Sequence, residues 1–184
     1  MLVKILPEWV DQARDVEAKI ARSKTLKRKN YTHLSVPRRY FYGELGHVAF
    51  EHTLEEKGKA FRSCHRTDGK PDDYDVIAWA TSGRVLRLDV KTASSQNYRK
   101  IMIPDAQLQR HHRDIYVAVR LEEDETLARM MGWATRTDAL EWTVSFFGDY
   151  RVPTRSQTFS ALRTMESLYE QLEDEDGRVD RRRP

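Results

Sequence analysis

The sequence predicts a mixed α/β fold, in which a mixed central β-sheet is flanked by helices. Two amphipathic helical patterns come first, a series of short apolar runs rich in β-branched residues follows, and one helical pattern interrupts those runs. Hydrophobic residues make up 39% of the 184 residues and charged residues 33%, which is a polar but globular balance. A chain of this length buries roughly 70% of its unfolded surface, enough for one core without cross-links.

Two helices are expected in the first third of the chain. The first spans 8–26, because apolar residues recur there at steps of three and four: Trp9, Ala13, Val16 and Ile20. Pro37 disfavours helix just before it, so 30–37 is predicted to be a connection. The second helix then spans 39–56, and Gly58 is a plausible stop.

The remaining elements are mostly strands. The predicted strands cover 60–65, 75–80, 85–91, 115–121 and 130–135. The segment 142–147 reads as a helix end or a strand. Two further helices are predicted, a short one over 104–113 and a final one over 158–172.

These elements are expected to form one domain around one sheet. We divide the chain into an N-terminal helix with a basic connection, the sheet core, a C-terminal helix region and a charged tail, at residues 1–36, 37–150, 151–172 and 173–184. The tail lacks a core residue except Val179, which predicts disorder.

Composition excludes several classes of protein. The single cysteine, Cys64, rules out an internal disulfide framework and a four-cysteine metal site within one chain. The sequence has no run of about 18 apolar residues, so it predicts no membrane span. The first residues, with acids close behind, do not resemble a signal peptide. We therefore expect a cytoplasmic (intracellular) protein with no membrane partner.

Positive charge is concentrated near the start of the chain. The net charge is +3, and residues 1–42 contain ten Lys or Arg against four Asp or Glu. Candidate contacts to a nucleic-acid backbone are Lys27, Arg28, Lys29, Arg38 and Arg39, with Arg99 and Lys100 in a later polar stretch. The alternative is that these side chains only form a solvated helix end and loops.

The most informative segment is a predicted hairpin over 75–91. A three-residue turn, Thr81-Ser82-Gly83, fits a type I turn with glycine in the left-handed position. That turn pairs residues whose numbers sum to 164 and places Asp75 beside Asp89. A two-residue turn would put the two carboxylates on opposite faces, so the register decides whether they meet.

Two adjacent carboxylates favour a hard divalent cation, which lowers their mutual repulsion. Lys91 shares the face of Asp89, where its ammonium can stabilise a negatively charged transition state. Together these groups suit phosphodiester hydrolysis with Mg²⁺ or Mn²⁺. The alternative is a solvent-facing ladder of salt bridges.

At this point the sequence resembles the PD-(D/E)xK nuclease superfamily, which includes small restriction-type endonucleases and Holliday junction resolvases. Asp75 matches the first Asp of the family pattern, and Asp89-Val90-Lys91 matches (D/E)xK. The segment 42–50 looks like the helix that opens the family core, and 104–119 and 132–135 look like the elements after the active-site hairpin. The resemblance covers about 40–136, and its specificity lies in the order of these short motifs.

The resemblance implies a restriction-endonuclease-like core and a set of site residues. Glu44, Asp75, Asp89 and the Val90 carbonyl would hold the metal, and Lys91 would stabilise the transition state. Related sequences often carry the helix acid where His47 stands here, so His47 and Glu51 remain alternatives to Glu44. Gln107 would contact the scissile phosphate or the Lys91 region.

The leading hypothesis is a Mg²⁺- or Mn²⁺-dependent DNA endonuclease, possible substrates being branched or phage DNA. The resemblance also implies a homodimer as one arrangement for cutting two strands. The alternative is a non-catalytic nucleic-acid-binding module on the same fold. A protein-interaction domain would instead show no salt-sensitive affinity for nucleic acid.

Overall fold

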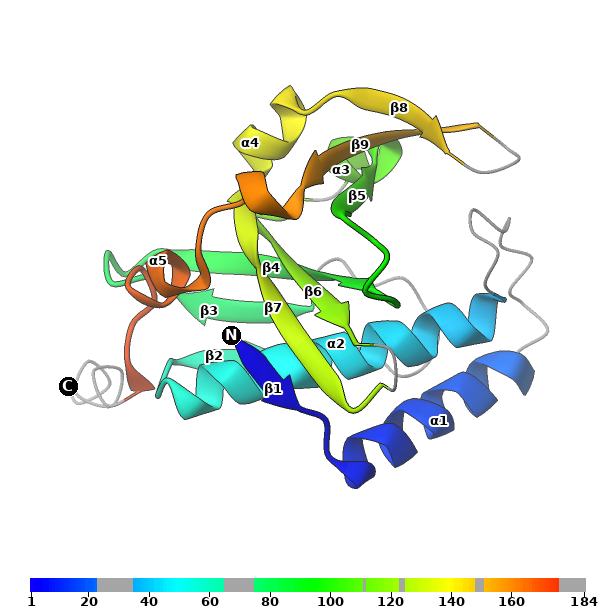
Figure 1. The fold of residues 1–184 in the computed structure, drawn as a ribbon. Coiled ribbons are helices and arrows are strands. Elements are labelled where there is room, and N and C mark those ends of the chain that lie inside the picture. Colours follow the sequence, from blue (N-terminus) through cyan, green and yellow to red (C-terminus); the bar gives the residue numbers. More distant parts are fainter. Residues whose placement is uncertain (23–34, 65–74, 111, 123–124, 148–150, 176–184) are drawn as a thin grey trace.

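A six-stranded sheet runs through the middle of the molecule, with two long helices on one side and a smaller three-stranded sheet on the other (Figure 1). The computed structural model describes residues 1–22, 35–64, 75–110, 112–122, 125–147 and 151–175. The mixed α/β class and the mixed sheet flanked by helices are confirmed. The expectation of one sheet is wrong, since the described residues form two.

The six-stranded sheet has the order β1-β7-β6-β4-β3-β2. Its strands in chain order are β1 (Leu2–Lys4), β2 (Phe61–Ser63), β3 (Val76–Trp79), β4 (Val85–Ala93), β6 (Ile115–Leu121) and β7 (Leu127–Thr135). Only the β4–β6 pair is parallel, and the other described pairs are antiparallel. The five predicted strands are present, whereas β1 was not predicted.

The two long helices pack side by side on one face of this sheet, with α2 against the strands and α1 outside it (Figure 1). The helix α1 spans Pro7–Arg22 and α2 spans Val36–Glu56. The start of α2 lies three residues before the predicted one, because Ser35 caps it by accepting a hydrogen bond from the Arg38 N–H at 3.3 Å. Gly58 ends the helix region at φ +59°, as predicted. No helix in the described ranges is long and apolar enough to cross a membrane.

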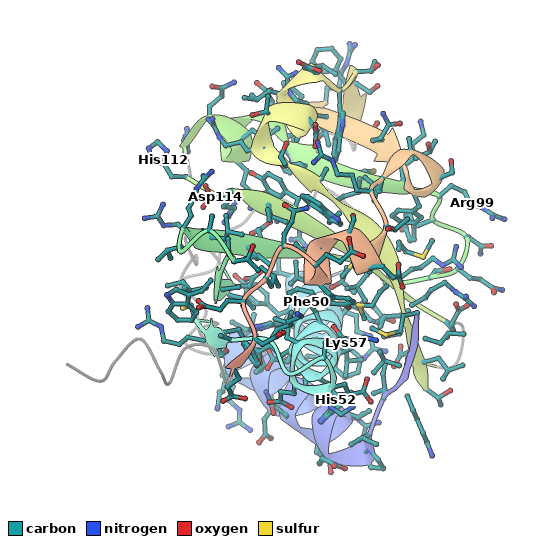
Figure 2. The ribbon with its side chains drawn as sticks, turned by 90° about the vertical axis from the view of Figure 1, so that its left-hand side faces the viewer. Phe50, His52, Lys57, Arg99, His112 and Asp114 are labelled. Carbon is teal, nitrogen blue, oxygen red and sulfur yellow. The ribbon has the colours of Figure 1, made fainter. Side chains whose placement is uncertain are left out.

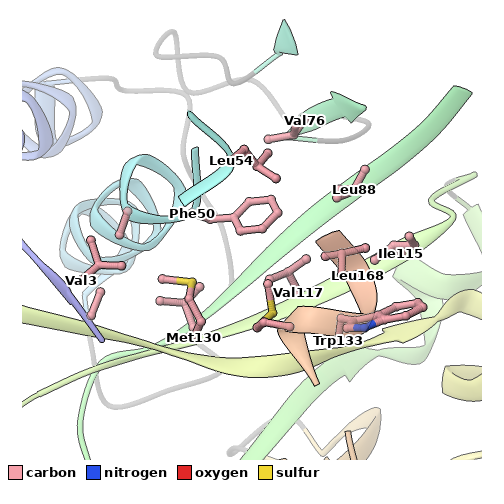
Figure 3. Close-up of a cluster of buried hydrophobic side chains, with 14 of the residues drawn as sticks. Val3, Phe50, Leu54, Val76, Leu88, Ile115, Val117, Met130, Trp133 and Leu168 are labelled. Atoms are coloured by element: carbon pink, nitrogen blue, oxygen red, sulfur yellow. The ribbon is translucent and has the colours of Figure 1, made fainter. Parts of the chain in front are cut away.

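The main core lies between α2 and the sheet. Phe50 and Leu54 of α2 meet strand residues such as Leu88 and Val117, and Trp133 of β7 lies at one end of this cluster (Figure 3). The short helix α5 (Met165–Tyr169) closes the same core.

The second sheet covers the opposite face and has the order β5-β9-β8. Its strands are β5 (Lys100–Pro104), β8 (Val144–Phe147) and β9 (Val152–Thr158). Two short helices, α3 (Asp105–Arg110) and α4 (Arg136–Glu141), pack beside it. A second core, which includes Ile103 and Tyr116, fills the space between the sheets.

The single final helix predicted over 158–172 is wrong. The chain there ends β9, forms a 3₁₀ turn η1 (Phe159–Ala161), and begins α5 only after a break. At the break Arg163 exchanges two backbone hydrogen bonds of 3.0 Å with Trp133 of β7, which withdraws that backbone from a helix. Thr164 then caps α5.

The predicted disordered tail begins too early. Ala60 donates a backbone hydrogen bond of 2.8 Å to the Glu173 carbonyl, and Lys59 pairs with Asp174 at 2.5 Å. Residues 173–175 are therefore packed on the start of β2, while 176–184 lie outside the described residues.

The register of the β3–β4 hairpin is confirmed. Val76 pairs with Leu88 and Ala78 with Leu86, and the Gly83 N–H donates to the Ala80 carbonyl at 2.7 Å, with Gly83 at φ +81°. Along its other edge β4 pairs with β6 from Leu88 to Ala93. The candidate site lies around Leu88, where the pairing with β3 ends and the pairing with β6 begins.

Candidate active site

Asp75 is hydrogen-bonded to β4 on both sides of Asp89, at Leu88 and at Val90. Its backbone N–H donates to the Leu88 carbonyl at 2.9 Å, and its Oδ2 accepts from the Val90 N–H at 2.6 Å. The carboxylate thus takes a hydrogen bond from β4 just before the first residue of β3. Asp75 therefore bonds both sequence neighbours of Asp89, and the two aspartates lie opposite each other as predicted.

Asp89 and Lys91 point to the face of the sheet that carries the second core. In the parallel register Asp89 lies beside Tyr116 and Lys91 beside Ala118, both of which belong to that core. The intervening Val90 packs on the main core with α2. Alternation along β4 therefore directs the charged pair away from α2.

Asp89 is almost completely buried, with 3% of its surface exposed, and lies between two cations. Its Oδ1 is 2.9 Å from Nε of Arg113, which is also buried, and its Oδ2 forms an ion pair with Lys91 Nζ. Burial raises the pKa of Asp89, and Lys91 and Arg113 oppose that rise while the charge of Asp75 adds to it. The two cations are the groups that favour an ionised Asp89 in this site.

Gln107 on α3 completes the surroundings of Lys91. With its amide oxygen turned toward the cations, that oxygen accepts from Lys91 Nζ at 3.1 Å and from Arg113 Nη2 at 3.2 Å. The short helix predicted after the hairpin thus brings Gln107 to Lys91, one of the two places expected for it.

Two residues of this site were not predicted, Arg113 and Tyr116. Burial, followed by the charge of Asp89, raises the pKa of Tyr116 to about 12, so the phenol remains protonated at neutral pH. The signal that could have identified both residues is the parallel pairing of β6 with β4, which places Tyr116 beside Asp89.

The candidate residues on α2 are Glu44, His47 and Glu51, and they do not lie on the side of the helix that touches β4. A Cβ added to Gly46 would be 2.0 Å from Thr92 Oγ1, so Gly46 marks the side that touches β4. Glu44 lies about 160° around the helix from Gly46. Its buried Oε1 accepts from Gln12 Nε2 of α1 at 2.6 Å, and His47 Nε2 is 2.9 Å from Glu51 Oε1.

The structure therefore brings Asp75, Asp89, Lys91 and Gln107 together, and it places Glu44 against α1. Within the described ranges, no group of three or more His, Cys, Asp or Glu side chains is arranged to hold a metal ion.

The predicted phosphate contacts lie in different environments. Lys27, Arg28 and Lys29 lie outside the described residues. Arg38 is 2.7 Å from Glu125 Oε1 and stacks on the Phe41 ring at 4.1 Å. Burial alone would lower the pKa of Arg38, but its hydrogen bond with Tyr42 and the nearby carboxylates raise it. These contacts hold Arg38 within the fold.

Arg99 and Lys100 are exposed, and Arg39 lines a pocket next to Lys91. Figure 2 shows Arg99 at the opposite side of the molecule from His112 and Asp114. Because the Asp114 N–H donates to the Arg87 carbonyl, β4 leads from the side of Asp114 toward that of Arg99. Among the predicted phosphate contacts that the structure describes, Arg39, Arg99 and Lys100 thus lie beyond the candidate site, toward the C-terminal end of β4.

Comparison of the sequence with known family models and with curated proteins finds no match.

Proposed function

We propose that the protein is a Mg²⁺- or Mn²⁺-dependent endonuclease that hydrolyses phosphodiester bonds in DNA. The observation that carries the proposal is the pair Asp75 and Asp89 on adjacent strands, with Lys91 and Gln107 at Asp89. The proposal includes a restriction-endonuclease-like core. It is supported by the order α2, β3, β4, α3, β6, β7, into which β2 and β5 are inserted, and by the parallel β4–β6 pair.

The donor chemistry of the site suits a hard cation. Asp75 and Asp89 offer carboxylate oxygens, the ligand type that Mg²⁺ and Mn²⁺ take. In this proposal the Val90 carbonyl is a further ligand. Glu44, the helix ligand expected from the sequence, lies against α1 and away from the side of α2 that touches β4, so it is not part of the proposed site. When bound, the metal would lower the pKa of water and so supply the nucleophile.

The residues around Asp89 have separate roles in the proposal. Lys91 stabilises the negative charge that develops on the phosphate, and Gln107 orients the Lys91 ammonium through the 3.1 Å contact. Arg113 fixes one oxygen of Asp89 and keeps the carboxylate oriented. Arg99 and Lys100 bind backbone phosphates away from the reacting bond.

A second candidate is a non-catalytic nucleic-acid-binding module. The observation that favours it is that both oxygens of Asp89 already face cations, Oδ1 facing Arg113 and Oδ2 facing Lys91. Such an internally neutralised carboxylate can serve stability alone. This candidate predicts DNA binding that persists in Lys91→Ala without cleavage by any form of the protein.

The test is cleavage of supercoiled, linear duplex and branched DNA with Mg²⁺, with Mn²⁺ and with chelator. The variants are Lys91→Ala and Asp75→Asn, the latter retaining an oxygen for the Val90 N–H. Lys4→Ala and Asp11→Asn are matched controls, because both residues are exposed and lie on β1 and α1. Circular dichroism verifies that each variant is folded.

The proposal expects metal-dependent cleavage by the wild type and both controls, and a loss of at least 100-fold in the two site variants. Cleavage that Lys91→Ala retains at the wild-type rate would contradict it. Analytical ultracentrifugation of the same samples tests the homodimer, which the proposal includes as the form that cuts two strands.

A further inference from the structure

We propose that the pocket beyond Lys91 binds one unpaired nucleobase of a DNA strand, so that the preferred substrate is single-stranded or locally unpaired DNA. This inference rests on the proposed function, since it places the base next to the phosphate at Lys91. It adds a substrate class and a binding residue, Tyr98.

The pocket has a volume of about 240 Å³ and lies where α2, the end of β4, β5 and η1 meet. Sites for drug-sized ligands hold roughly 300–1,000 Å³. A pocket slightly below that range suits one planar ring system with its sugar outside. Its lining residues are Arg39, Tyr42, Lys91, Thr92, Ala93, Ser94, Tyr98, Lys100, Ile101, Met102 and Phe159.

Aromatic and apolar groups provide faces for a planar ligand. The pocket is lined by Tyr42, Tyr98 and Phe159, and the apolar side chains of Ile101 and Met102 lie with them. Base stacking on such aromatic rings is tolerant of sequence because every base has a π-face.

The three aromatic residues are held in place by contacts outside the pocket, through the ring of Tyr42 and through the backbone of Tyr98 and Phe159. The Tyr42 ring packs edge-on against Phe41 at 5.4 Å, with the Arg38 guanidinium 4.6 Å from its centre. The Phe159 N–H donates to the Arg99 carbonyl at 3.1 Å, and the Tyr98 N–H to the Ser95 carbonyl at 3.1 Å. The aromatic residues are thus attached to well-bonded backbone, which limits the entropy lost on binding.

Charge favours a nucleic-acid strand over a neutral aromatic ligand. Arg39, Lys91 and Lys100 line the pocket, and no carboxylate belongs to its described lining. Phosphates on both sides of a base would therefore meet cations.

Lys91 belongs to both sites, since its ammonium pairs with Asp89 and its side chain lines the pocket. A phosphate at Lys91 would have its nucleoside within reach of the pocket. A paired base must first be flipped out of the duplex, which costs about a few kcal/mol, whereas an unpaired base enters without that cost. The geometry thus selects unpaired DNA.

The experiment measures binding without divalent metal, so it does not depend on cleavage. Fluorescence anisotropy compares a labelled single-stranded oligonucleotide, the same strand with abasic sites, and the matching duplex. The variants are Tyr98→Ala and Tyr98→Phe. Phe146→Ala is the control, because Phe146 is a 59% exposed aromatic residue on β8 that does not line the pocket.

We expect the abasic strand to bind the wild type roughly 5- to 150-fold more weakly than the intact strand, the range that stacking of one base contributes. Tyr98→Ala should reduce affinity for the intact strand by a similar factor and leave the abasic strand unaffected. Tyr98→Phe and Phe146→Ala should bind like the wild type.

Equal affinity for intact and abasic strands would overturn the inference, whatever the variants do, and so would duplex binding as tight as that of the single strand. Displacement of the strand by free dAMP at the strand's own affinity would assign the pocket to a mononucleotide and also overturn it. The two proposals fail separately: base-dependent binding without cleavage would refute only the nuclease, and metal-dependent cleavage with abasic-insensitive binding only the pocket.

Discussion

Two glycines on α2 predict opposite effects of the same substitution. A Cβ added to Gly46 would lie 2.0 Å from Thr92 Oγ1 and 2.8 Å from Thr92 Cγ2, whereas one added to Gly43 would meet no atom within 4 Å. Alanine stabilises a helix interior by about 0.5–1 kcal/mol relative to glycine at either position. Only Gly46→Ala adds an overpacking cost, about 1–3 kcal/mol, toward the upper end for contacts this short.

We therefore expect Gly43→Ala to raise the free energy of unfolding by up to about 1 kcal/mol. Gly46→Ala should lower that free energy by about 1–2 kcal/mol. Because the gain in helix propensity is common to both variants, their difference isolates the contact between α2 and β4. Urea unfolding followed by circular dichroism measures it, provided that the m-value is unchanged.

The double variant Gly46→Ala with Thr92→Ala removes the two shortest contacts. It should recover part of the loss, with a coupling energy of at least about 0.5 kcal/mol in the double-mutant cycle. Equal stability of Gly46→Ala and Gly43→Ala would refute the reasoning, because α2 would then not be held against β4 by the absence of a side chain.

Two further substitutions test contacts outside the site. Asp138→Ala removes the capping box of α4 and should lower the free energy of unfolding by about 1 kcal/mol at pH 7. Burial alone would raise the pKa of Asp138, but hydrogen bonds from Thr135 and the charge of Arg163 lower it. The stabilisation is therefore present above about pH 4, the ordinary pKa of Asp, and is lost as the pH falls through the lower folded pKa; urea midpoints that differ equally at all pH values would contradict this. Tyr169→Phe leaves Thr53 without the buried 3.0 Å hydrogen bond from the Tyr169 hydroxyl, and should cost about 1 kcal/mol in thermal unfolding, whereas an unchanged midpoint would mean that this bond adds no net stability.

The hairpin could be predicted because its information is local. The turn Thr81-Ser82-Gly83 sets the register by itself, and the register brings Asp75 to Asp89. The role of Gln107 came from the resemblance, and the short helix that carries it was predicted from the local sequence. Arg113 and Tyr116 could not be found this way, because their approach to Asp89 depends on a parallel pairing of β4 with β6.

The C-terminal region shows the opposite case. Leu162, Met165, Leu168 and Leu172 have helical spacing, yet the chain breaks at Arg163 because its backbone bonds Trp133 of β7. The strand β5 was missed although Ile101 and Ile103 alternate around Met102, since its partner β9 lies more than 50 residues later. In both segments a partner remote in sequence overrides the local pattern.

Strand β4 is bonded to β3 along one edge up to Leu88 and to β6 along the other edge from Leu88 onward, so the site lies where the two pairings overlap. Asp75 moves with the β3–β4 hairpin, whereas Lys91 lies on the part of β4 that is bonded to β6. The hydrogen bond from Val90 to the Asp75 carboxylate joins these two parts, so it fixes the position of Asp75 relative to Asp89.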